Sequence, residues 1–172
     1  MIVFGAGARA ALGTGIGSAS IPVLLVISGF GLVTASYFPT DPILGYPPGG
    51  ARSFIPSAHG EVHHLASLAV FVCLPIVCFS AARRFRHVHR SRSWSLLSYA
   101  TALLLVASMA AFMVCMAMAA NAPLDPPGPA GLFERSFSVV ASLWLSLFAL
   151  KLMRLGEASA SWRLASTRRD MT

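Results

Sequence analysis

The chain has 172 residues, of which 56% are hydrophobic and only 11% are charged. A soluble domain of this length carries about a quarter charged residues, so the composition excludes an ordinary soluble domain and predicts an integral membrane protein. The net charge of +7 does not require nucleic acid, because basic residues mark the cytoplasmic loops of membrane proteins, and we expect no nucleic-acid partner.

Residues 1–18 form a short N-terminal segment that we expect on the cytoplasmic side of the membrane. Their sequence, MIVFGAGARAALGTGIGS, has no basic residues ahead of its apolar stretch, and glycines interrupt that stretch. Both properties argue against a secretory signal peptide, which leaves a short segment ahead of the membrane domain.

Four apolar segments follow, and each approaches the roughly 20 residues that cross a bilayer as a helix. The predicted fold is an all-α membrane protein whose transmembrane domain, residues 19–155, is a bundle of four helices. A basic cytoplasmic tail, residues 156–172, completes the chain. The four helices are expected at about 20–38, 61–82, 95–120 and 132–154.

The charges are distributed along the chain in a way that orients the bundle. All basic residues except Arg52 and Arg135 fall in the N-terminal segment, in the loop between the second and third helices, or at the end of the last helix and in the tail. Because cytoplasmic loops carry the excess of arginine and lysine, both termini should be cytoplasmic in a multi-pass protein of the cell membrane. The opposite side holds most of the acids: Asp41, Glu61, Asp125 and Glu134.

The loop RRFRHVHRSRS, between the second and third helices, is strongly basic. Basic residues at a membrane surface attract anionic lipid headgroups by about 1 kcal/mol each, so we expect such lipids as partners beside the bilayer itself. Lys151 is the only lysine among the 13 basic residues, and this arginine bias hints at a high-GC bacterial gene.

The start of the second helix, HGEVHHLA, carries the candidate chemistry of the chain. His59 and His63 lie four residues apart, which places them about 40° apart on one helical face. Two imidazoles on consecutive turns are a common metal-binding geometry, and Asp41, at the end of the first helix, lies at the same membrane depth. The candidate metal ligands are therefore Asp41, His59 and His63, with zinc as the expected ion.

The same residues also fit a purely structural role, which we weigh above the metal site. The two histidines would then hydrogen-bond to Asp41, to loop carbonyls or to Glu134, and would hold helix ends together where loop backbone needs partners. Glu134, in the first turn of the last helix, is the candidate fourth member of the cluster. In a catalytic role the metal would activate water for hydrolysis, and Glu134 would act as acid or base.

Three motifs occur in a fixed order along the chain. The first helix ends in F-P-x-D, here residues 38–41, and the second opens with H-G-x-x-H, here residues 59–63. The last helix opens with an E-R pair, Glu134 and Arg135, and carries Trp144. Together these motifs, spread over most of the chain, resemble the prokaryotic membrane family catalogued as domain of unknown function 998.

The resemblance implies a fold and supplies no activity, because no established function is attached to that family. Its members usually look like six-helix proteins, so the resemblance implies that two N-terminal helices are missing here. In that comparison MIVFGAGARAALG looks like the end of a preceding helix with the turn after it, and Met1 looks like an internal start.

Two classes of function remain, and the sequence leaves open whether the protein is an enzyme. The first, which we favour, is a structural or lipid-interacting bundle with an extracytoplasmic cluster of His, Asp and Glu residues. The second is a membrane-embedded, metal-dependent hydrolase acting on a lipid. Part of a small transporter is a further alternative, and it would need a homo-oligomer because four helices offer little room for a substrate path.

Overall fold

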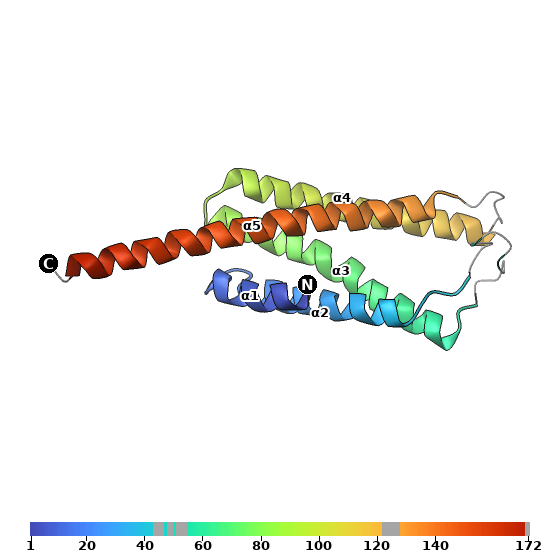
Figure 1. Ribbon diagram of the computed structural model, residues 1–172. Coiled ribbons are helices and arrows are strands. Elements are labelled where there is room, and N and C mark those ends of the chain that lie inside the picture. Colours follow the sequence, from blue (N-terminus) through green and yellow to red (C-terminus); the bar gives the residue numbers. More distant parts are fainter. Residues whose placement is uncertain (43–46, 48–49, 51–54, 122–127, 171–172) are drawn as a thin grey trace.

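The computed structural model describes residues 1–42, 47, 50, 55–121 and 128–170, with the side chains of these residues up to 157. Within them the chain is helical and contains no strand, which confirms the predicted fold class. Arg52 and Asp125, which entered the charge pattern, lie outside the described residues. The helices, shown in Figure 1, are α1 (Ile2–Leu12), α2 (Ser20–Tyr37), α3 (Ala58–His87), α4 (Arg92–Asn121) and α5 (Ala130–Asp170).

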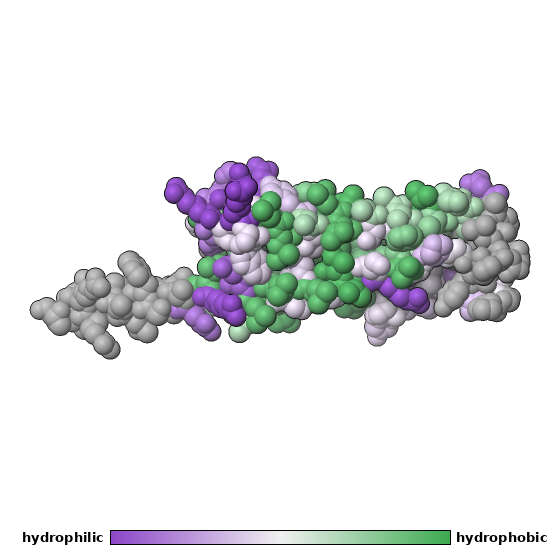
Figure 2. All heavy atoms as spheres, turned by 90° about the horizontal axis from the view of Figure 1, so that it is seen from above, coloured by the Kyte–Doolittle hydropathy of each residue, from purple (hydrophilic) through white to green (hydrophobic). Residues whose placement is uncertain are grey.

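Four helices are long and apolar enough to cross a membrane, as predicted: α2, α3, α4 and the part of α5 from Ala130 to Glu157. Large apolar side chains lie on the outward faces of these helices and form the green surface of Figure 2. Lipid tails are as apolar as leucine, so exposing such faces carries no penalty in a bilayer. The chain is therefore a multi-pass membrane protein.

The helices extend further than the apolar segments that predicted them. Helix α3 begins at Ala58 instead of 61 and continues to His87 instead of 82. Helix α5 continues through the expected tail to Asp170, and its C-terminal part extends past the other helices in Figure 1. Hydropathy marks where contact with lipid ends, whereas arginine and glutamate are good helix formers that carry a helix on into water.

Helix α1 forms within the expected N-terminal segment and packs along α2. A Cβ atom on Gly29 of α2 would lie 2.8 Å from the backbone nitrogen of Ile2, so a larger residue there would push α1 away. Gly31 allows α2 to approach α3 in the same way, because a Cβ atom at this position would lie 2.7 Å from the carbonyl oxygen of Ala66 in α3. Glycines thus let α2 approach α1 and α3 closely, as small residues do between helices in lipid.

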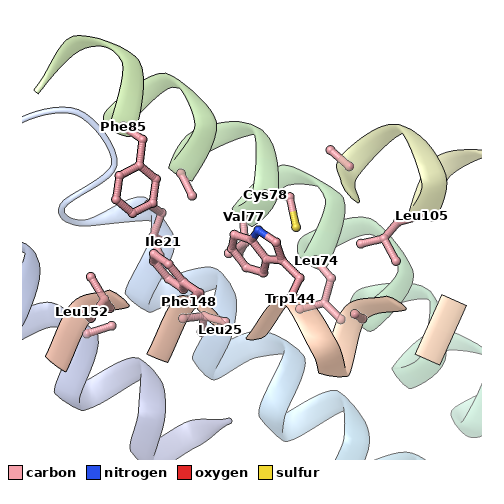
Figure 3. Packing of buried hydrophobic residues seen from close by; sticks show 14 of the residues in the cluster. Ile21, Leu25, Leu74, Val77, Cys78, Phe85, Leu105, Trp144, Phe148 and Leu152 are labelled. Carbon is pink, nitrogen blue, oxygen red and sulfur yellow. The ribbon is translucent and has the colours of Figure 1, made fainter. Parts of the chain in front are cut away.

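The core lies where the spanning helices meet, and Figure 3 shows its close packing. Trp144 of α5 stacks on Phe148 with ring centroids 4.8 Å apart, and its Nε1 donates to Ser98 Oγ of α4 at 3.2 Å. That bond gives the indole N–H a partner in a layer without water. The largest fully buried side chains come from α2, α3, α4 and α5: Ile21, Leu25, Phe85, Leu105 and Phe148.

Candidate functional site

Asp41 joins the end of α2 to the beginning of α3. Its Oδ2 accepts a hydrogen bond of 2.7 Å from the backbone N–H of Ser57, and its Oδ1 accepts one of 2.9 Å from the Ser57 hydroxyl. Ser57 is the N-cap of α3, and its Oγ also accepts the backbone N–H of Gly60 at 3.2 Å. The carboxylate therefore fixes the residue that caps the helix.

These bonds also set the charge of Asp41. The Ser57 backbone N–H and hydroxyl both favour the ionised carboxylate and hold its pKa below the ordinary value of 3.8. His64 and His59 act in the same direction more weakly, while partial desolvation opposes them. Asp41 is therefore an anion at neutral pH, and both of its oxygens are engaged by the N-cap.

Gly60 is required by the position of this carboxylate. A Cβ atom at Gly60 would collide with Oδ2 of Asp41 and would lie 3.0 Å from its Cγ. The carboxylate is held by two bonds to Ser57 and cannot move aside without breaking them. This contact gives a physical reason for the glycine in the H-G-x-x-H motif.

His63 binds the carbonyl groups that α2 leaves at its C-terminal end. Its Nδ1 lies 2.7 Å from the carbonyl oxygen of Phe38 and 3.1 Å from that of Ala35. Carbonyl oxygens only accept, so Nδ1 carries the hydrogen, and in the neutral ring Nε2 carries the lone pair. The half-buried His63 is thus a side-chain cap for α2.

His59 contributes a ring contact and little burial. The side chain is exposed, and its imidazole meets the Phe38 ring edge-on with centroids 5.3 Å apart. His64, on the next position after His63, has its ring 6.1 Å from that of His63. We call Asp41, Ser57, His59, Gly60 and His63 the α2–α3 cluster.

The predicted metal ligands belong to this cluster, whereas the predicted acid/base group lies on another helix, α5. Among the described residues, no group of three His, Cys, Asp or Glu side chains is placed to hold a metal ion, so the zinc site stays a prediction. Glu134 is exposed on α5, and within the described part of the chain no hydrogen bond or ion pair joins it to Asp41 or either histidine. Its membership of the cluster also stays a prediction.

Sequence reasoning did not single out Ser57 or Arg84. Ser57 falls in a Pro- and Gly-rich loop, and the signal that would have found it is a serine one residue before the helix, with Glu61 in the first turn. Arg84 belongs to the basic stretch RRFRHVHRSRS, whose arginines the charge pattern does not distinguish, yet its side chain is only 4% exposed. Its phase on α3, three residues after the buried Ala81, would have placed it on the inner face.

Arg84 closes the turn between α1 and α2. Its Nη1 donates to the carbonyl oxygens of Ile16 at 2.8 Å and Thr14 at 3.3 Å, and its Nη2 donates to that of Leu12. Leu12 is the last residue of α1, so the guanidinium caps that helix from a residue distant in sequence.

The comparison with known protein families assigns the chain to a group and leaves its activity unassigned. The family model described as Protein of unknown function (DUF998) matches residues 1–151, which include α1, the α2–α3 cluster and most of the spanning part of α5. No curated protein and no solved structure matches the chain. The match covers far more than half of the chain, so this protein belongs to the DUF998 family.

Proposed function

We propose that this protein is a non-enzymatic multi-pass bundle of the cell membrane, in which the α2–α3 cluster fastens two helix ends on the extracytoplasmic side. Both termini would then face the cytoplasm, as the excess of arginine at the opposite end of the helices favours. The observation that carries the proposal is that polar atoms of the cluster form hydrogen bonds to backbone groups at the two helix ends. Asp41 binds the N-cap of α3, and His63 binds the last carbonyls of α2.

The physical reason for such a cluster lies in the ends of spanning helices. A helix leaves four N–H groups at its start and four carbonyls at its end without partners inside the helix. A backbone group of this kind that packing shields from water is costly to leave unpaired, because nothing replaces the missing bond. Side chains that bind these groups therefore stabilise the bundle without needing a substrate.

One observation favours the metal-dependent alternative, so the experiment below also measures metal content. A histidine that ligates a metal through one ring nitrogen usually donates the other N–H to a carbonyl or carboxylate. His63 has this arrangement, with Nδ1 on the Phe38 carbonyl and the lone pair of the neutral ring on Nε2. A zinc ion bound there would need further ligands, for which His59 and Asp41 are the candidates.

The deciding experiment measures metal content and stability on the same preparations. We expect the purified full chain in neutral detergent to contain no stoichiometric zinc. The variant His63→Ala should lower the free energy of unfolding by about 1–3 kcal/mol, because two carbonyls lose a donor. The matched variant His59→Ala should lower it by less than about 1 kcal/mol, because that side chain is exposed.

Two results would contradict the proposal. Zinc bound at one ion per chain and lost in a His59→Ala/His63→Ala double variant would identify a metal centre. Equal stability of the wild-type chain and His63→Ala would show that the ring does not hold the end of α2.

A further inference from the structure

Three arginines at the α3–α4 turn line an open hollow of about 360 Å³: Arg86, Arg90 and Arg92. All three side chains are exposed, and within the described residues none of them has a hydrogen bond or an ion pair. A hollow of this size lies at the lower end of the roughly 300–1,000 Å³ of small-ligand sites. The turn lies at the opposite end of α3 from the α2–α3 cluster, so its role is independent of the proposed function.

The surroundings of the hollow add positive charge. Arg84 is buried two residues before Arg86 on α3, and Lys151 of α5 places its Nζ 5.7 Å from the centre of the Trp94 ring. His89, which precedes Arg90 in the chain, is half-buried, and its pKa is lowered first by burial and then by the charges of Arg84 and Lys151. A positive field that acts on one neighbour also acts on a ligand, and it favours an anion.

Two of the three arginines occupy backbone positions that do not favour arginine. Arg90 has a φ of 49°, the left-handed region where glycine is favoured, and it is the only described residue other than glycine with a positive φ. Arg92 is the first residue of α4, where the positive end of the helix dipole disfavours a cation. Residues that break local rules in this way are expected where a site has a function beyond folding.

We propose that this hollow binds the phosphate group of an anionic lipid headgroup through the guanidinium groups of Arg86, Arg90 and Arg92. Guanidinium forks match phosphate oxygens in pairs, and a charge-assisted bond of this kind is stronger than a neutral one. The source is a lipid because the turn connects two spanning helices, at the level where headgroups lie. Figure 2 shows hydrophilic residues gathered at the left end of the compact part, the end at which the α3–α4 turn lies in Figure 1.

The test compares lipid affinity between variants of the full chain in neutral detergent. Native mass spectrometry would count bound dioleoylphosphatidylglycerol, with dioleoylphosphatidylcholine as the uncharged control lipid. We expect the wild-type chain to bind the anionic lipid at least tenfold more tightly than the control. Arg90→Gly should weaken the anionic lipid about tenfold, because a charge-assisted bond is lost. The same variant should unfold at an unchanged or higher temperature, because glycine suits a positive φ.

A second variant and a matched control separate this site from diffuse surface charge. Arg92→Gln should also weaken the anionic lipid about tenfold, since it removes another guanidinium group from the hollow. Arg83→Gln removes one exposed charge from the same end of α3 without altering the hollow, and it should change the affinity less than about twofold. Equal losses in all three variants would overturn the proposal in favour of a diffuse charge effect.

A soluble anion is the other source of the same chemistry, and inorganic phosphate is its probe. If millimolar inorganic phosphate displaces phosphatidylglycerol and stabilises the wild-type chain but not Arg90→Gly, the lipid assignment is wrong. Unchanged lipid affinity in both Arg90→Gly and Arg92→Gln would remove the site altogether.

Discussion

Replacing Arg84 with methionine removes the donors that close the α1–α2 turn while keeping a long side chain in the same space. The Leu12 carbonyl accepts its bond in a buried position, and a buried acceptor left without a donor costs about 1–3 kcal/mol. Thr14 and Ile16 are exposed, so water can replace their lost bonds at about 1 kcal/mol or less each. The buried Nε of Arg84 has no partner in the described structure, and removing it offsets part of the loss.

The expected net result for Arg84→Met is a fall of about 2–4 kcal/mol in the free energy of unfolding. The assay is denaturant unfolding of the full chain in mixed micelles, followed by the fluorescence of the tryptophans. Hydrogen exchange supplies a local measurement, because the amides of residues 13–17 should exchange faster once the turn opens. Arg83→Met is the matched control, since Arg83 is exposed, and it should stay within about 0.5 kcal/mol of the wild-type chain. Equal stabilities of the two variants would refute the reasoning that the Arg84 guanidinium holds α1 in place.

Three further predictions concern the α2–α3 cluster and the core. Gly60→Ala should lower stability by about 1–3 kcal/mol, because its Cβ displaces the Asp41 carboxylate; in an Asp41→Ala background the same change should become neutral or stabilising, and an equal loss in both backgrounds would contradict the clash. Asp41→Asn should reduce the melting temperature at neutral pH. Because the folded pKa of Asp41 is depressed, its contribution is present above the ordinary value of 3.8 and is lost as pH falls through the lower folded pKa. The gap between wild type and Asp41→Asn should therefore shrink progressively as pH falls below 3.8, and a gap that keeps its full size down to about pH 2 would show that the charge is not responsible. Trp144→Phe should cost about 1 kcal/mol for the lost bond to Ser98 and a further amount for the buried ring that is removed, and adding Ser98→Ala to Trp144→Phe should cost little more because the bond is already absent.

The number of spanning helices and the helical class could be predicted because both depend on the length and apolarity of segments. A run of about 20 apolar residues has few alternatives to a spanning helix, whatever its neighbours are. The helix ends depend on different physics. The Ser57 side chain accepts a hydrogen bond from a backbone N–H in the first turn of α3 and so fixes where the helix begins. Charged residues from Arg83 onward continue the helix beyond the apolar layer, where hydropathy gives no signal.

The candidate site was predictable only where spacing alone decides geometry. The separation of His59 and His63 fixes their common face on α3, whatever lies opposite. The partners of the side chains depend on how neighbouring helices pack, and that is set by contacts such as the one between Gly31 and Ala66. The sequence therefore could not distinguish a carbonyl from a carboxylate or a metal as the group facing His63.

Helix α3 caps a preceding helix at each of its two ends. The two caps use different polar side chains because the carbonyl groups that they bind are arranged differently. Near its start, His63 donates to the last carbonyls of α2, and near its end, Arg84 donates to the last carbonyl of α1. A short ring suffices at the first position, because Phe38 lies in direct contact with α3 there. The second position needs a long side chain with several donors, because the turn it closes offers three carbonyls spread over residues 12–16. Since α3 is fixed to both preceding helices by these caps, loss of either one should loosen its own helix end while the shared apolar core keeps the other end in place.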